Sequence, residues 1–218
     1  QNQILENRLE GALTREPAMS DFVEKVAAPD AVPGGGSVAA LAGSLGAALG
    51  EMVAGLTEGR KKYEAVDGQV RESHAKLALA RGHLRELIQA DSAAYQEVVD
   101  AMKLPKGTDA EKAARADAVE LATRHATEIP LTTARAAAEV LDHLQILASI
   151  GNPNARSDTA TGAQLAFAAL KGAQYNVLIN AGSLKDKSFA GDCLNEAAEL
   201  ERKGWTVLQS IDSLITAP

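Results

Sequence analysis

The sequence predicts an all-α protein: a single-domain helical bundle with long antiparallel helices. Aromatic residues make up only 3% of the 218 residues, and alanine dominates the composition. Alanine is the best helix former, whereas strands favour the β-branched and aromatic residues that are sparse here. Apolar residues also recur at steps of three and four, which is the period of an amphipathic helix. The connections between the predicted helices are short, which favours one bundle.

The chain divides into an N-terminal extension or docking helix, residues 1–19, and a helical domain, residues 20–218. A short amphipathic pattern occupies residues 4–13. A second short helix is predicted to begin at Ser20-Asp21 and to end before Pro29, with Phe22 and Val23 among its apolar residues.

A glycine turn, Pro33-Gly34-Gly35-Gly36-Ser37, precedes the apolar run 38–57. Consecutive glycines allow positive φ and leave backbone N–H groups uncovered, and Ser37 would then be the N-cap of the next helix. The positive end of a helix dipole and its unpaired N–H groups suit an anion or the polar edge of a heterocycle. We therefore expect a binding site at this turn.

The helix that follows contains four glycines: Gly43, Gly46, Gly50 and Gly55. Each helical glycine costs about 0.8–1 kcal/mol relative to alanine, so another interaction must offset them. Gly46 and Gly50 share one face and would let a second helix approach closely. We predict a buried central helix that packs on helices of its own chain or of a dimer mate.

Two other interpretations of this region are rejected. Gly34, Gly36 and Ala39 fit a dinucleotide-binding pattern, but no strand precedes them and no βαβ unit follows. The apolar run is nearly long enough to span a membrane, but it is rich in alanine and glycine and contains Glu51. We expect no membrane insertion.

A basic cluster, Arg60, Lys61 and Lys62 followed by Tyr63, ends this region. It either complements the helix dipole or binds an anionic ligand. Residues 64–102 then form one helical stripe whose apolar part contains a single carboxylate, Asp91. A carboxylate on a core-facing stripe is costly unless it is paired, hydrogen-bonded or protonated. Asp91 is either satisfied by an internal partner or is an acid/base group with a shifted pKa in a cleft.

The second half of the chain continues the helical pattern. A capping box at Thr108 begins a helix that runs to about residue 127, and Pro130 starts or kinks a further helix that ends at Gly151. The polar loop 151–158 carries Asn152 and Asp158, and Ser157 or Asp158 is expected to cap the next helix.

That helix places Asn176 and Asn180 on one face, where they either bind a ligand or bridge buried backbone groups. The last helix, from about residue 188 to 215, is predicted to serve packing.

Charge and cysteine content limit the function. The net charge of −7 argues against nucleic acid as the main partner. The single Cys193 excludes an internal disulfide framework, and the polar N-terminus shows no signal peptide, so we expect a cytoplasmic protein. The histidines lack H-E-x-x-H spacing and there is no cysteine cluster, so any catalysis is expected to be metal-free, with no permanently bound cofactor.

Seven spaced blocks resemble the cyclodeaminase/cyclohydrolase family of tetrahydrofolate enzymes. They cover roughly residues 20–190 and begin with the glycine turn and the run that follows it. The other blocks are Gly59-Arg60-Lys61-Lys62-Tyr63, Asp91 with Ala94-Tyr95, Met102-Lys103-Leu104-Pro105-Lys106, Pro130-Leu131, Gly151-Asn152 with Ser157-Asp158, and Asn176 to Asn180.

The resemblance implies an all-α bundle that forms a homodimer through long helices, with Asp91 as the acidic catalytic residue. It implies a tetrahydrofolate derivative as substrate, bound by Gly34, Gly35, Gly36, Ser37, Lys61, Lys62, Tyr63, Asn152, Asp158 and Asn180. The expected reaction is cyclodeamination of 5-formiminotetrahydrofolate to 5,10-methenyltetrahydrofolate and ammonia, with a separate formiminotransferase supplying the substrate. The alternatives are a methenyltetrahydrofolate cyclohydrolase and a non-catalytic folate-binding module.

Overall fold

The computed structural model describes residues 19–216, and over that range it contains helices and turns but no strand. The predicted all-α, single-domain fold is thereby confirmed. The helices are α2 (Met19–Ala27), α3 (Gly35–Gly55), α4 (Asp67–Met102), α5 (Asp109–Ile150), α6 (Arg156–Gly182) and α7 (Lys187–Thr216), with two short 3-10 segments, η1 (Lys61–Val66) and η2 (Pro153–Ala155). The predicted extension or docking helix of residues 1–19 lies almost wholly outside the described residues.

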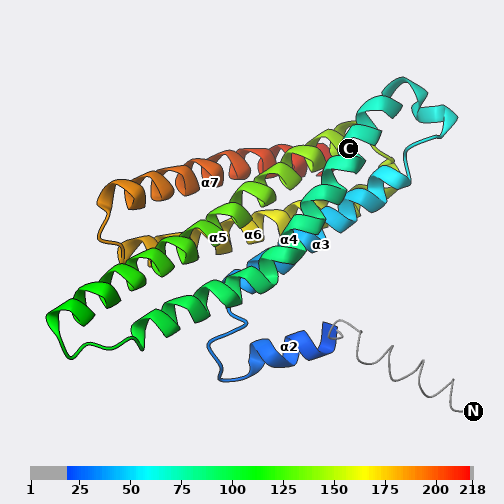
Figure 1. The fold of residues 1–218 in the computed structure, drawn as a ribbon. Helices are drawn as coiled ribbons and strands as arrows, with labels where there is room; N and C mark the ends of the chain where they lie inside the picture. Colours follow the sequence, from blue (N-terminus) through cyan, green and yellow to red (C-terminus); the bar gives the residue numbers. More distant parts are fainter. Residues whose placement is uncertain (1–18, 217–218) are drawn as a thin grey trace, which may run out of the picture.

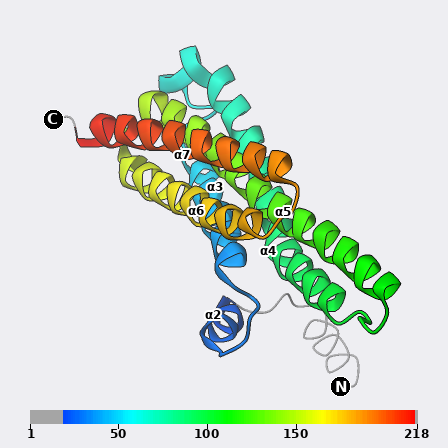
Figure 2. The same cartoon turned by 90° about the vertical axis from the view of Figure 1, so that its left-hand side faces the viewer.

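Helix α3 is the central element of an elongated bundle (Figure 1). It packs chiefly on α4 and α6 and also touches α5, while α7 covers α5 and α6. Figures 1 and 2 both show that the far ends of α4 and α5 extend beyond the other helices, and that α2 stands off the bundle. The core is aliphatic, and its largest fully buried side chains include Leu77, Leu84, Leu141, Leu144, Leu147 and Leu170.

The glycines of α3 permit the close helix contacts that the sequence predicts. A Cβ atom added to Gly46 would lie 2.7 Å from the carbonyl oxygen of Gly162 in α6, and one added to Gly50 would lie 2.8 Å from Leu77 Cδ1. Helix α3 is long and apolar enough to cross a membrane by length and composition alone, but half of that stretch is buried inside the bundle. Packing within the chain therefore accounts for the buried half of this stretch.

Helix α5 runs continuously from Asp109 to Ile150 through Pro130, so the prediction that a new helix starts at this proline is wrong. A proline inside a helix removes the hydrogen bond to the carbonyl four residues earlier, here that of Ala126. The side chain of Asn180 replaces it, because Asn180 Nδ2 donates to the Ala126 carbonyl oxygen at 2.6 Å. Packing along both flanks, together with this donor from α6, keeps α5 helical.

Candidate active site

A cavity of about 270 Å³ opens at the N-terminal end of α3, where α4, α5 and α6 meet it. The link from α2 to α3 and the first turn of α3 form one side, and a carboxylate lies among the lining groups. The lining residues are Ala31, Val32, Gly34, Gly35, Gly36, Asp91, Tyr95, Val98, Met102, Thr123, Ala126, Asn176, Asn180 and Ser183.

Asp91 of α4 lies directly against the first turn of α3. A Cβ atom added to Gly36 would fall 2.0 Å from Asp91 Oδ1, so only glycine leaves room for this carboxylate. The first N–H groups of a helix have no partner within the helix and carry its positive end. The half-buried carboxylate is therefore brought close to the helix start, where the sequence predicts a binding site.

The expectation that Ser37 caps this helix is wrong. Helix α3 begins at Gly35, with Gly34 as its N-cap, so Ser37 is inside the helix rather than at its cap. Within the described residues only Gly59 has a positive φ, so the glycine turn uses ordinary backbone angles. Gly36 instead permits the close approach of Asp91, and this contact between α3 and α4 is not visible in local sequence.

The Ser37 hydroxyl is fully buried and faces three oxygen atoms of α4. Ser37 Oγ lies 2.9 Å from Asp91 Oδ2, 3.0 Å from the Ile88 carbonyl oxygen and 3.2 Å from Ser92 Oγ. A hydroxyl carries one proton, so it can donate to only one of these acceptors at a time. Ser37 donates to Asp91 when the carboxylate is ionised, and can accept from Asp91 when it is protonated.

Burial raises the pKa of Asp91 above its ordinary value, and hydrogen bonds from the side chain and backbone of Ser37 partly oppose this rise. Desolvation disfavours the charged form of a carboxylate, whereas donated hydrogen bonds favour it. The two effects bring the protonated and ionised forms closer in free energy than in a solvated aspartate. Such a group suits proton transfer in both directions.

The opposite wall of the cavity comes from α6 and carries two carboxamides. Asn176 Nδ2 donates to the Gly172 carbonyl oxygen of its own helix at 2.9 Å, and Asn180 Nδ2 is held by the Ala126 carbonyl. Both amide nitrogens thus bridge backbone carbonyls, which is the alternative role that the sequence leaves open for them. Their Oδ1 atoms remain as the acceptors that a ligand could use.

Five predicted binding residues lie away from this cavity. Lys61, Lys62 and Tyr63 belong to η1, beyond the opposite end of α3, and 21 helical residues span about 30 Å. Asn152 also belongs to that end, since its backbone N–H donates to Thr57 Oγ1 at 3.0 Å. Asp158 is in the first turn of α6.

The predicted cap at Ser157 or Asp158 is wrong, because α6 begins at Arg156 without a side-chain cap. Asn152 caps η2 instead, by accepting from the Asn154 N–H at 3.1 Å. The polar residues of the 151–158 loop therefore support local turns, and none of them lines the cavity that holds Asp91.

The structure also adds residues that were not predicted as site residues. Tyr95 lies one helical turn after Asp91 on the same stripe, so the stripe could have indicated it. Thr123 and Ser183 come from α5 and from the end of α6, and no sequence pattern marks them. A larger groove of about 710 Å³ between α3 and α4 contains Arg81 and Ile88, but Asp91 is not among its lining residues.

The fold and this cavity define a helical-bundle protein with a candidate acid/base site for a small polar molecule. Among residues 19–216, no three histidine, cysteine, aspartate or glutamate side chains gather to hold a metal ion. Comparison with known proteins identifies the family: the chain belongs to the formiminotransferase-cyclodeaminase family, whose model matches residues 18–199.

Three relatives illustrate the similarity. Methenyltetrahydrofolate cyclohydrolase of Methylorubrum extorquens is 41% identical over 80% of this chain and 84% of its own length. Formimidoyltransferase-cyclodeaminase of Gallus gallus is 40% identical over 77% of this chain, which spans only 31% of that protein. The crystal structure of formiminotetrahydrofolate cyclodeaminase from Thermotoga maritima superposes with a TM-score of 0.82 at 29% identity, covering 91% of this chain and 95% of that one.

Proposed function

We propose that this chain catalyses a reaction at the carbon that joins N5 and N10 of tetrahydrofolate, with Asp91 as the acid/base group. The observation that carries the proposal is a carboxylate of raised pKa in a cavity at a helix N-terminus. The names of the relatives support the substrate class, since each refers to a tetrahydrofolate derivative or to a cyclodeaminase.

Cyclodeamination is the leading reaction. N10 of 5-formiminotetrahydrofolate attacks the formimino carbon, and ionised Asp91 accepts the proton that N10 loses. Protonated Asp91 then returns a proton to the amino group, the C–N bond breaks and ammonia leaves, which yields 5,10-methenyltetrahydrofolate. A positioned acid/base group contributes about 10²–10⁴-fold to such a step, and an ionised carboxylate stabilises the amidinium-like cation.

Cyclohydrolysis is the second candidate, and the similarity to the Methylorubrum cyclohydrolase over most of both chains favours it. Here ionised Asp91 accepts a proton from water as the oxygen bonds to the methenyl carbon. The proton passes from Asp91 to N5 as the N5–C bond breaks, and the hydroxyl proton is released to solvent as the formyl C=O forms, which gives 10-formyltetrahydrofolate. Both reactions therefore need the same carboxylate in both protonation states.

Asp91→Asn tests the acid/base assignment. The variant keeps the size of the side chain but cannot accept a proton, so we expect turnover to fall by about 10²–10⁴-fold. The ultraviolet band of methenyltetrahydrofolate reports the reaction: its appearance from 5-formiminotetrahydrofolate indicates a deaminase, and its accelerated loss a hydrolase. Folate binding without either change indicates a non-catalytic module.

Asp142→Asn is the matched control for this test. The pKa of Asp142 is also raised, chiefly by burial, but this residue of α5 does not line the cavity. We expect near-normal turnover from this variant. Near-normal turnover of folded Asp91→Asn would contradict the proposed role of Asp91.

The homodimer belongs to the same proposal. Asp91 and the basic residues of η1 lie at opposite ends of α3. Within one chain, a ligand in the Asp91 cavity is therefore too far from Lys61 and Lys62 to contact them. A second copy packed antiparallel along α3 would place its Lys61 and Lys62 near Asp91, where they could meet the glutamate tail of folate. Three partly exposed apolar residues on α3, at seven-residue spacing, support this arrangement: Val38, Leu45 and Met52.

A further inference from the structure

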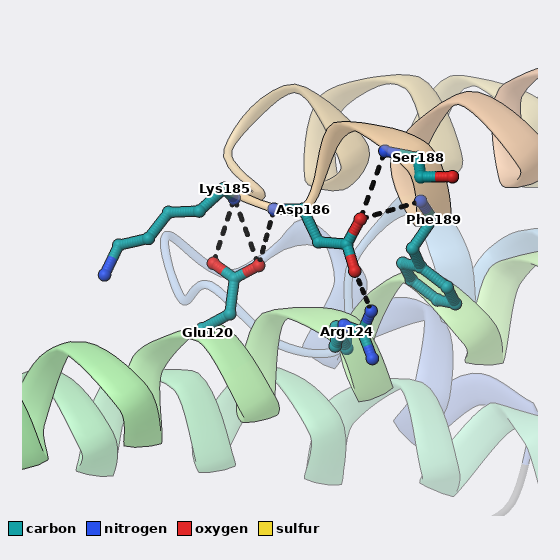
Figure 3. Close-up of polar contacts among 6 residues, drawn as sticks. All are labelled: Glu120, Arg124, Lys185, Asp186, Ser188 and Phe189. Atoms are coloured by element: carbon teal, nitrogen blue, oxygen red, sulfur yellow. Dashed lines mark hydrogen bonds and ion pairs between the residues drawn. The ribbon is translucent and has the colours of Figure 1, made fainter.

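A polar cluster fixes the turn between α6 and α7 onto α5 (Figure 3). The Glu120 carboxylate accepts from the backbone N–H of Lys185, at 3.0 Å, and from that of Asp186, at 3.1 Å. Asp186 in turn accepts from the N–H groups of Ser188 and Phe189 at 3.1 and 3.0 Å, and so caps the start of α7. We name Glu120, Arg124 and Asp186 the corner cluster.

Arg124 completes the cluster, one helical turn after Glu120 on α5. Its Nη2 donates to Asp186 Oδ2 at 2.5 Å, and its guanidinium lies 4.4 Å from the centroid of the Phe189 ring. Figure 3 shows Glu120 and Arg124 both reaching from α5 to the turn. Glu120 and Asp186 each have a pKa below the ordinary value, chiefly because each carboxylate accepts hydrogen bonds from backbone N–H groups.

The corner cluster borders the candidate active site. Thr123 and Ala126 of α5 line the cavity, between and just beyond the two cluster residues of that helix. Ser183, at the start of the turn between α6 and α7, lines the cavity as well, and so does Asn180, one helical turn before it in α6. The face of α5 that holds the turn is thus adjacent to the face that forms the cavity.

The cluster contributes little to the stability of the fold. Arg124 and Asp186 are 37% and 43% exposed, and exposed ion pairs contribute little to folding. The buried side chains Ala181, Leu184 and Ala190 pack this corner independently of it. We expect the cluster to matter more for ligand affinity than for stability, because a carboxamide that binds a ligand must be held within about 0.5 Å of its working position.

We propose that Arg124 and Glu120 are positioning residues that fix the α6 wall of the cavity and so set its affinity for the folate substrate. The inference rests on the proposed function. Arg124→Gln removes the ion pair and the contact with Phe189, while Asp91 on α4 and Ser37 on α3 are untouched. The expected result is a rise in KM of about two- to tenfold, the range of one neutral hydrogen bond, with kcat nearly unchanged.

Arg135→Gln is the matched control. Arg135 also joins α5 to α7, through two hydrogen bonds to Glu196 at 2.5 and 2.6 Å, and it is 50% exposed. Arg135 does not line the cavity. If the loss of an ion pair between these helices acts only through the structure of the bundle, KM should therefore rise equally in Arg124→Gln and Arg135→Gln. Arg124→Lys, which keeps the charge, is expected to restore part of the loss in KM.

Amide hydrogen exchange measures the turn without reference to activity. We expect the N–H groups of residues 185–189 to exchange faster in Arg124→Gln than in wild type, and to be unchanged in Arg135→Gln. An unchanged KM in Arg124→Gln, or an equal rise in Arg135→Gln, would overturn the positioning role. A wild-type protein that neither converts nor binds the folates would instead refute the proposed function.

Discussion

At the residue scale, the Ser37 hydroxyl couples the central helix to the protonation of Asp91. Ser37 Oγ carries one proton, which it can donate to only one acceptor of α4 at a time, and the hydrogen bond that it donates to Asp91 Oδ2 is stronger while Asp91 is ionised. Ser37 therefore stabilises the ionised form against the desolvation that raises the pKa of Asp91.

Ser37→Ala is expected to raise the pKa of Asp91 further. Removing a hydrogen bond that lowers a carboxylate pKa leaves desolvation less opposed, so protonation then persists to higher pH. Since the ionised form accepts the proton in the first step, kcat/KM falls as pH drops through this pKa. The acidic limb of the pH profile should therefore move to higher pH.

Ser44→Ala is the control for this profile, because Ser44 lies on the same helix and its hydroxyl interacts with the Arg81 carbonyl oxygen instead. Its acidic limb should match that of the wild type. An acidic limb that stays in place in Ser37→Ala would show that the hydroxyl does not act on Asp91.

The sequence could predict the position of Asp91 but not its partner. A single carboxylate on an apolar helical stripe is visible from periodicity alone, and the structure places it at a cavity. Ser37 looks like a helix cap because serine follows three glycines, a local pattern. Its actual partner is 54 residues away, and only the packing of α3 on α4 brings the two together.

At the scale of elements, Asn180 of α6 compensates for Pro130 of α5. The proline cannot donate to the Ala126 carbonyl, and Asn180 Nδ2 supplies the missing hydrogen bond at 2.6 Å. A part-buried carbonyl left without a partner beside the cavity would cost about 1–3 kcal/mol. The two residues should therefore be energetically coupled although they lie on different helices.

A double-mutant cycle tests this coupling. Asn180→Ala in the wild-type chain should lower the free energy of unfolding by about 1–3 kcal/mol, because the Ala126 carbonyl loses its donor. In a Pro130→Ala background the backbone N–H of residue 130 can donate to it, so the same change should cost less, by at least about 0.5 kcal/mol. Urea unfolding followed by circular dichroism gives all four values.

Asn176→Ala serves as the control, because Asn176 donates within its own helix, to Gly172. Its cost should not depend on the residue at position 130. Equal costs of Asn180→Ala in both backgrounds would show that the hydrogen bond does not compensate for the proline.

The limits of sequence prediction differ between elements. The long helices are predictable because apolar residues repeat at helical spacing and capping signals such as Thr108 are local; that capping box is present in the structure. At Pro130 of α5, the Ala126 carbonyl receives its hydrogen bond from Asn180, a donor 54 residues after Ala126 in the sequence. Helix α6 begins at Arg156, before the expected cap at Ser157 or Asp158, because it follows directly on the short 3-10 segment η2.

At the scale of the whole molecule, the chain places acidic and basic candidate groups at opposite ends of one helix. The exposed face of α3 carries Val38, Leu45 and Met52, which are 39%, 42% and 42% exposed. A two-fold interface repeats one patch on both subunits. Antiparallel pairing of α3 would therefore bury this stripe and set each Asp91 near the basic end of the partner.

Leu45→Glu is expected to weaken this dimer, because it places a charge at the centre of the stripe. Light scattering after size-exclusion chromatography should show a shift from dimer to monomer, together with loss of turnover. Leu79→Glu on α4, at a residue that is 71% exposed and outside the stripe, should leave both unchanged. A wild-type protein that is monomeric and active would contradict the shared site.

Mixed dimers test whether the two chains share one site. Asp91→Asn removes the acid/base group, and a Lys61→Ala/Lys62→Ala double variant should raise KM, more for polyglutamylated than for monoglutamylated folate. In a two-fold dimer formed from one chain of each kind, one of the two sites combines an intact Asp91 with intact lysines. Co-expressed chains should therefore show more activity at low polyglutamylated folate than the average of the two separate homodimers. Activity equal to that average would mean that each chain binds its substrate without the basic segment of its partner.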